Sequence, residues 1–119
     1  MRYLLLCCIN ENHWEDIPAP ERDAIMSEYG TWMQDLDTAG CHIASAQLQS
    51  TAKAATVRFR HGKQIITDGP FAETKEQLGG YHLIECADMG EATSIAARIP
   101  TLRVGGTVEV RPLVPGSEP

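Results

Sequence analysis

The run RYLLLCCI at residues 2–9 is the feature that most limits how this chain folds. Both alternating sets of side chains in it are apolar: Tyr3, Leu5, Cys7 and Ile9 in one set, and Leu4, Leu6 and Cys8 in the other. A strand with one face in water alternates apolar with polar residues, so this pattern predicts a strand that is covered on both faces. The run is too short to span a membrane and polar residues follow it at once. We therefore interpret it as a core strand of a cytoplasmic protein rather than as a secretory signal.

The rest of the chain alternates segments typical of strands with segments typical of helices. We expect a loop over 10–19, helices over 20–39 and 88–99, and strands over 42–49, 55–60, 63–67, 80–86 and 107–113. Pro20 suits the first turn of a helix, Gly40 suits a helix end, and Pro100 ends the second helix. The order is strand–helix–strand, then a hairpin, then strand–helix–strand. It predicts an α+β, ferredoxin-like fold with one antiparallel sheet.

Three glycines indicate close approaches of the backbone. Gly30 lies inside the first expected helix, where glycine costs about 1 kcal/mol relative to alanine, so we expect something to pack closely against it. Gly79 and Gly80 precede a strand and predict a bulge there. The partner that approaches them is expected to be a second subunit rather than a ligand.

Two helices can cover only one face of such a sheet, which leaves the second apolar face of the opening strand without a cover. A second copy of the same sheet would supply it, so we expect a homodimer that forms through the sheet faces. At 119 residues the chain fits a single domain over 1–114, followed by a flexible tail over 115–119.

Composition argues against several classes of function. A net charge of −6 gives no basic face for nucleic acid, and no apolar run is long enough for a membrane span. The cysteines Cys7, Cys8, Cys41 and Cys86 lack the spacing of a metal or redox motif and are expected to be reduced, buried thiols. The four histidines show no metal-ligand spacing, and no phosphate-binding or dinucleotide-binding motif occurs. We therefore expect neither a metal nor a cofactor.

Residues 68–81, DGPFAETKEQLGGY, resemble the DGPF-type branch of the YCII-related family closely. The opening strand, the Tyr29-Gly30 step, residues 97–100 and residues 108–112 are also similar to that family, so the resemblance covers 1–113. It implies a ferredoxin-like fold that pairs into a dimeric α/β barrel, and a regulatory role linked to extracytoplasmic-function sigma factors. An enzymatic branch of the wider superfamily carries a His–Asp pair at positions that hold Tyr29 and Ile99 here. That pair is therefore not present in this chain.

Candidate site residues lie on the first helix, the loop after the hairpin and the last two strands. Tyr29, His82 and Glu109 are the candidates for acid–base catalysis, because their side chains exchange protons or donate hydrogen bonds. The candidates for ligand binding are Asp68, Phe71, Glu73, Lys75, Gly80, Tyr81 and Arg111. For the loop at 68–71, Gly69 permits a positive φ and Pro70 fixes its own φ, so a purely structural turn is the competing interpretation. An ion pair between Glu109 and Arg111 is the competing interpretation on the last strand.

Two functions remain open from the sequence. The first is a small-ligand-binding or regulatory domain, which the missing His–Asp pair favours. The second is a cofactor-free enzyme that acts on a small aromatic or lactone-like metabolite by acid–base chemistry. A pocket that contains Tyr29, His82 or Glu109 with a strongly shifted pKa would favour the enzyme, whereas a filled and dry interior would favour the binding domain.

Overall fold

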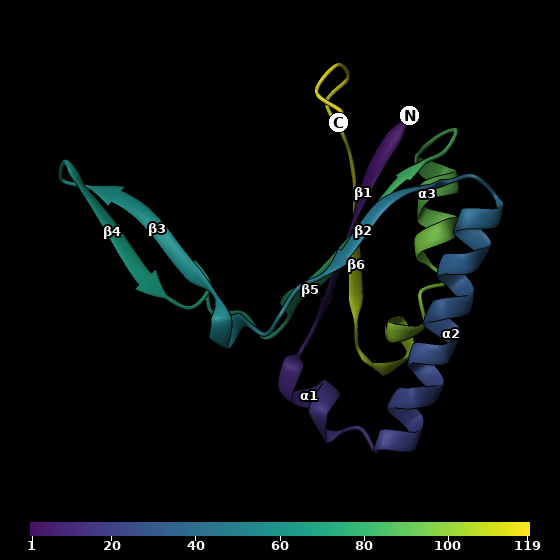
Figure 1. Ribbon diagram of the computed structural model, residues 1–119, viewed down its shortest axis with the longest axis horizontal. Helices are drawn as coiled ribbons and strands as arrows, with labels where there is room; N and C mark the ends of the chain where they lie inside the picture. The colour runs from purple at the N-terminus through teal and green to yellow at the C-terminus, as the bar shows by residue number, and fades with distance from the viewer.

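A computed structural model describes residues 1–119 as a four-stranded sheet with helices on one face and a separate two-stranded arm (Figure 1). The strands are β1 (Arg2–Ile9), β2 (His42–Gln47), β3 (Ala55–Arg60), β4 (Lys63–Asp68), β5 (Gln77–Glu85) and β6 (Thr107–Pro112). The helices are α1 (Glu11–Asp16), α2 (Ala19–Thr38) and α3 (Met89–Ala96), with short 3-10 helices η1 (Thr51–Lys53) and η2 (Pro100–Val104).

The main sheet has the strand order β2-β5-β1-β6, and every neighbouring pair runs antiparallel. This is the order that two strand–helix–strand units give when they interlock, so the predicted ferredoxin-like α+β fold is confirmed. α2 and α3 lie together on one face of the sheet (Figure 1). No helix of the chain is both long enough and apolar enough to cross a membrane.

The expected loop after β1 is wrong in part, because residues 11–16 form the short helix α1. Asn10 begins this helix: its side-chain oxygen accepts a hydrogen bond from the backbone N–H of His13 at 3.0 Å. An asparagine cap of this kind satisfies a backbone donor that the first turn leaves free. The helix has only six residues and carries no apolar stripe, which is why periodicity did not reveal it.

Helix α2 begins one residue before the expected start and buries Ile25, Trp32 and Leu36 against the sheet. The close packing expected at Gly30 is wrong. That residue is exposed, and a Cβ atom added there would meet nothing within 4 Å. The stripe that packs on the sheet lies on the other side of the helix.

Helix α3 begins at a capping arrangement, as expected. An Asp88 side-chain oxygen accepts from the backbone N–H of Glu91 at 2.9 Å, and the Glu91 carboxylate accepts from the N–H of Ala87 at 3.2 Å. The helix ends at Ala96 rather than at Pro100, which instead opens η2. Ile99 therefore lies between the two elements, and only 1% of its surface is exposed.

The two faces of β1 differ within a single chain, although its pattern predicts that both are covered. Tyr3 and Leu5 are buried beneath the helices, whereas Leu4 and Leu6 on the opposite face are only partly buried. We call this opposite side the outer face; cross-strand register assigns to it Leu83, Tyr81, Glu109 and Arg111 as well, because each is paired with Leu4 or Leu6. The helices α2 and α3 both lie on the other face of the sheet, and Leu83 is the one buried member of the outer face, with 6% of its surface exposed.

A β-bulge at Gly79 shifts the register between β1 and β5, as expected from the paired glycines. Cys7 pairs with Gly80 and Cys8 with Leu78, so Gly79 is the additional residue. The close approach at Gly80 comes from within the chain, which corrects the expectation of a second subunit. A Cβ atom there would lie 2.9 Å from the backbone oxygen of Ala46 in β2.

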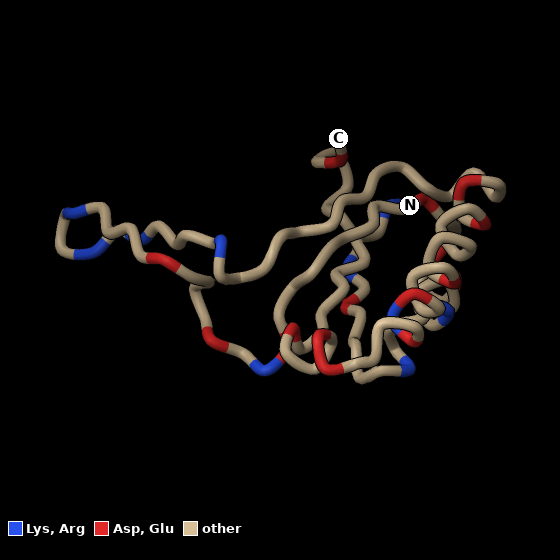
Figure 2. Tube along the Cα trace, turned by 60° about the horizontal axis from the view of Figure 1, so that its bottom comes forward, with Lys and Arg blue, Asp and Glu red and all other residues tan.

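The predicted hairpin is confirmed, but β3 and β4 pair only with each other and project from the main sheet as an arm (Figure 1). His61 and Gly62 form the turn with φ values of 52° and 72°. Cross-strand register places the exposed side chains of Val57, Phe59 and Ile66 on one face of the arm. Arg58, Arg60 and Lys63 occupy the other face, so one side of the arm is apolar and the other is basic. Figure 2 shows that lysines and arginines gather along the arm.

Candidate functional site

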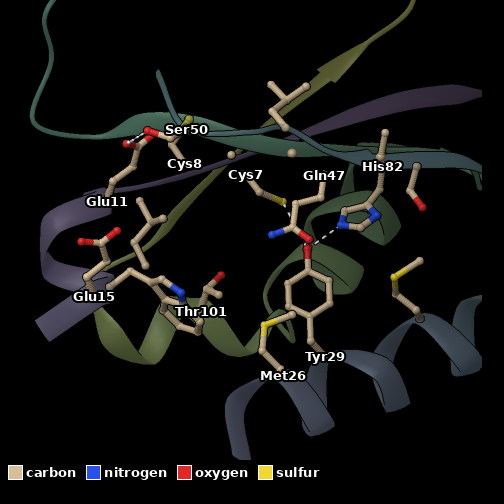
Figure 3. A pocket seen from close by; sticks show the side chains of 18 residues that line it. Cys7, Cys8, Glu11, Glu15, Met26, Tyr29, Gln47, Ser50, His82 and Thr101 are labelled. Carbon is tan, nitrogen blue, oxygen red and sulfur yellow. Dashed lines mark hydrogen bonds between the residues drawn. The ribbon is translucent and has the colours of Figure 1, made fainter. Parts of the chain in front are cut away.

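A cavity of about 510 Å³ lies between the main sheet and the helices α1 and α2 (Figure 3). Its wall comprises Cys7, Cys8, Ile9, Glu11, Trp14, Glu15, Met26, Tyr29, Met33, Ser45, Ala46, Gln47, Leu48, Ser50, Gly79, Gly80, His82 and Thr101. A volume of this size is typical of pockets for small organic ligands. The interior between sheet and helices is therefore not completely filled.

Tyr29 from α2 and His82 from β5 meet in the wall of this cavity (Figure 3). The Tyr29 hydroxyl oxygen lies 2.5 Å from His82 Nε2, a hydrogen bond, and 3.6 Å from the Cys7 sulfur. His82 shares the inward face of β5 because it is paired with Leu5, the buried residue of β1. The two side chains are 53 residues apart in the sequence, and only the folded sheet brings them together.

An aromatic cluster fixes the orientation of this pair. The ring of Trp32 packs edge-on against His82 with centroids 4.9 Å apart and edge-on against Tyr29 at 5.6 Å. Trp32 is itself held, because its indole N–H donates to the backbone oxygen of Ile95 at 3.0 Å. Buried aromatic packing with a satisfied polar atom restricts side-chain rotation, so the site is preorganised.

Burial keeps both members of the pair neutral at pH 7. Burial lowers the pKa of His82 from its usual 6.5 to about 4, with a smaller contribution from His42. Burial also raises the pKa of the Tyr29 hydroxyl well above 10, and the Cys7 thiol adds to that shift. A phenol and a neutral imidazole in contact form a hydrogen-bonded donor–acceptor pair, and either group can exchange a proton with a bound ligand.

The unpartnered nitrogen of His82 indicates which tautomer is present. Nδ1 of His82 is buried and has no hydrogen-bond partner. An unpaired N–H in the interior is rarer than an unpaired acceptor, so we assign the proton to Nε2, which then donates to the Tyr29 oxygen. In this tautomer the Tyr29 O–H is free to donate to the Cys7 sulfur or to a ligand in the cavity.

Two glutamates of α1 lie at the edge of the cavity, and their surroundings differ (Figure 3). The Glu11 carboxylate accepts hydrogen bonds from the Thr51 backbone N–H at 2.9 Å and the Ser50 hydroxyl at 2.8 Å. The bond from Thr51 is the main reason why the pKa of Glu11 is lowered. Glu11 thus ties α1 to η1. Glu15 forms no hydrogen bond or ion pair within the chain and is exposed.

Of the residues predicted for the site, the structure brings Tyr29, His82 and Gly80 together in the cavity wall. Tyr81, Glu109 and Arg111 lie on the outer face, on the other side of the sheet. There the Glu109 carboxylate accepts from Arg111 Nε at 2.6 Å, which agrees with the interpretation as an ion pair.

The loop at residues 68–71, here called the DGPF loop, borders a second cavity of about 670 Å³ at the base of the arm. Pro70 and Phe71 lie in the wall of that cavity. Asp68, Glu73 and Lys75 are absent from the walls of both cavities. Gly69 has a φ of 92°, so the turn needs its glycine as expected. Arg58 on the arm donates to the backbone oxygen of Phe71 at 2.7 Å, which holds this loop against the basic face of the arm.

Several wall residues were not predicted from the sequence. Cys7 was expected to be an inert buried thiol, and Trp14 and Glu15 fell in the expected loop. The alternation in β1 places Cys7 on the same face as Leu5, and this pattern could have identified Cys7 as a residue of the inner face. No group of three or more His, Cys, Asp or Glu side chains is arranged to hold a metal ion.

Residues 1–117 match the model of the YCII-related domain family, so the chain belongs to this family. An uncharacterised protein of Rhizobium meliloti (strain 1021) is 37% identical over 123 residues, covering 100% of this chain and 99% of that protein.

Among solved structures, the chain resembles 5-chloro-2-hydroxyhydroquinone dehydrochlorinase (TftG) from Burkholderia phenoliruptrix AC1100, in complex with 2,5-dihydroxybenzoquinone. The TM-score is 0.58 at 13% identity, with 98% of this chain and 96% of that chain covered. This likeness supports the fold. Within this chain Ile99 is packed in the apolar core, and Tyr29 is paired with His82.

Proposed function

We propose that this protein is an acid–base enzyme that acts on a small oxygenated aromatic or lactone-like metabolite bound beside Tyr29. The observation that carries the proposal is the hydrogen bond between Tyr29 and His82 in the wall of an unfilled cavity. The mostly apolar wall suits a flat carbon ring, and the pair supplies the only concentrated acid–base chemistry in it. TftG, which shares the fold, acts on a chlorinated hydroxyhydroquinone, and this agrees with a ligand of that general class.

The chemistry follows from the tautomer assigned above. Tyr29 donates its O–H to an oxygen atom of the ligand and transfers that proton as negative charge develops there. The Tyr29 oxygen then accepts a stronger hydrogen bond from His82 Nε2–H, which offsets the charge left on it. A water molecule takes up the carbon-bound proton that the ligand releases as it becomes an enol. When that carbon regains a proton from solvent, the enol oxygen returns its proton to Tyr29, which restores the site. Positioned acid–base groups of this kind accelerate proton transfer by about 10²–10⁴-fold.

The test uses small electron-rich phenols and butenolide lactones as probes in deuterium oxide. Binding is followed by the fluorescence of Trp14 and Trp32, which lie at the cavity and against His82. Exchange of carbon-bound hydrogen is followed by proton NMR. We expect Tyr29→Phe to slow exchange at least about a hundredfold while the fold is retained. If the probes bind but their carbon-bound hydrogen exchanges no faster than in buffer, the cavity is a binding site and not a catalytic site. A regulatory ligand-binding domain would then be the better description.

We further propose that two copies pair through their outer faces. The partly exposed leucines of that face, Leu4 and Leu6, suit contact with a copy of the same surface, and the Glu109–Arg111 ion pair at its edge carries no net charge. Light scattering should give about twice 13.0 kDa, and a clean monomer would contradict this pairing.

Four unpaired cysteines support a reducing, cytoplasmic location, and residues 68–81 support assignment to the DGPF-type branch.

A further inference from the structure

The charges around the main cavity all have one sign. Its wall includes no lysine or arginine, and its two ionisable carboxylates are Glu11 and Glu15. His82 adds no positive charge at neutral pH, because burial lowers its pKa to about 4. An anionic ligand would therefore enter an apolar space that offers no cation to pair with it, at a substantial free-energy penalty.

The two carboxylates are not equivalent as ligand groups. Glu11 is already engaged by Ser50 and Thr51, which hold its oxygens at the junction of α1 and η1. Glu15 follows one helical turn later and has no partner in the chain. Trp14 beside it also lines the cavity, and an aromatic ring is a second group that attracts cations. The side of the cavity near α1 thus carries the unpaired carboxylate of Glu15 and the indole ring of Trp14.

We infer that the cavity selects uncharged or cationic ligands, and that Glu15 binds the ammonium group of a phenolic arylalkylamine whose hydroxyl oxygen meets Tyr29. This inference rests on the proposed function, since it uses the same cavity and the same Tyr29–His82 pair. Figure 3 shows Glu15 and Tyr29 at separate parts of the wall, so one elongated ligand can contact both. Carboxylated and phosphorylated metabolites are excluded by the same charges.

The test compares three phenols that share a two-carbon para chain but carry a cationic, no charged, or an anionic end group: tyramine, para-ethylphenol and para-hydroxyphenylpropanoate. Binding to the full chain is measured by calorimetry near pH 7 and low salt. We expect tyramine to bind about fivefold tighter than para-ethylphenol, the effect of one exposed ion pair worth about 1 kcal/mol. The propanoate should bind more weakly than either. The differences should shrink in about 0.5 M salt, where exposed charges are screened.

Glu15→Gln is the diagnostic variant, and Asp16→Asn is its matched control. Asp16 is the next residue of α1, is exposed and lies outside the cavity wall, so its loss changes net charge equally. We expect Glu15→Gln to abolish the preference for tyramine over para-ethylphenol, with Asp16→Asn retaining it. An unchanged preference in Glu15→Gln, or three equal affinities in the unmodified protein, overturns the inference and leaves the proposed function in place. Failure of all three phenols to bind also overturns the inference, and the exchange test with butenolide lactones then decides the proposed function.

Discussion

The two faces of the main sheet are built by the same strands but differ in what they contact. On the inner face β1 and β5 contribute Tyr3, Leu5 and Ile84, which pack beneath the helices, and His82, which meets Tyr29. On the outer face the intervening residues Leu4 and Leu6 are partly exposed, and neither α2 nor α3 lies over them. Because side chains alternate along a strand, two neighbouring residues point to opposite faces. One can therefore belong to the acid–base site while the next belongs to the contact surface.

This alternation separates the candidate residues more sharply than their chemistry does. His82 and Tyr81 are neighbours in sequence, yet only His82 lines the cavity. Glu109 is an acid on the last strand, but it lies on the outer face in an ion pair with Arg111. Proton-exchanging side chains therefore mark a site only when the face that carries them also meets a cavity.

The largest expected difference between the faces is in packing. Leu5 is fully buried, so Leu5→Ala should lower the free energy of unfolding by about 2–5 kcal/mol at any protein concentration. Leu6→Ala on the outer face should cost clearly less. Its effect should grow with protein concentration, because a second copy covers that face only when dimers form. Urea unfolding at two concentrations measures both. Equal, concentration-independent losses would contradict the comparison.

The next largest effect concerns pH. His82 has a pKa of about 4 in the folded chain and the usual 6.5 when unfolded, so below pH 6.5 the unfolded state binds more protons. Stability from this group is fully present above pH 6.5 and decreases by up to about 3 kcal/mol as the pH falls to about 4. Urea unfolding as a function of pH tests this. His82→Gln should remove this dependence, whereas His61→Gln at the exposed turn should retain it.

A matched pair of glycine substitutions tests how tightly the cavity wall is held. Gly80→Ala puts a methyl group 2.9 Å from the Ala46 oxygen, and we expect a loss of about 1–3 kcal/mol. At Gly79 the nearest atom, the Cys7 oxygen, lies at 3.8 Å, so Gly79→Ala should change stability by less than about 1 kcal/mol. Thermal melts of the two variants decide the matter. A larger loss at position 79 would mean that the bulge, not β2, limits the space.

The smallest effect is expected on the outer face. Arg111→Ala removes one partner of an exposed ion pair, and such pairs contribute about 0–1 kcal/mol. The loss should diminish further as salt is raised. Measured with dilute protein, a cost above about 2 kcal/mol would show that the pair is buried in the monomer, which would remove the distinction between the faces.

The sequence predicted the fold well because most of its elements carry strong local signals. The hairpin turn, the cap at Asp88 and the bulge at Gly79 each depend on a few adjacent residues. The site was only partly predictable. Tyr29 and His82 were separate candidates, since their contact depends on how α2 crosses β5. With apolar residues on both sides of β1, the pattern does not indicate which face the helices cover, so His82 and Glu109 appeared equivalent.

The projecting arm has a consequence for the electrostatics of the whole molecule. Residues 53–68 carry four of the ten lysines and arginines but only one of the sixteen acidic residues, although the chain as a whole has a charge of −6 (Figure 2). The protein is therefore an electric dipole whose positive end extends away from a negative body. At an anionic surface such as a cation-exchange resin, this acidic protein would approach arm first, and its behaviour there would be set by the arm rather than by its isoelectric point.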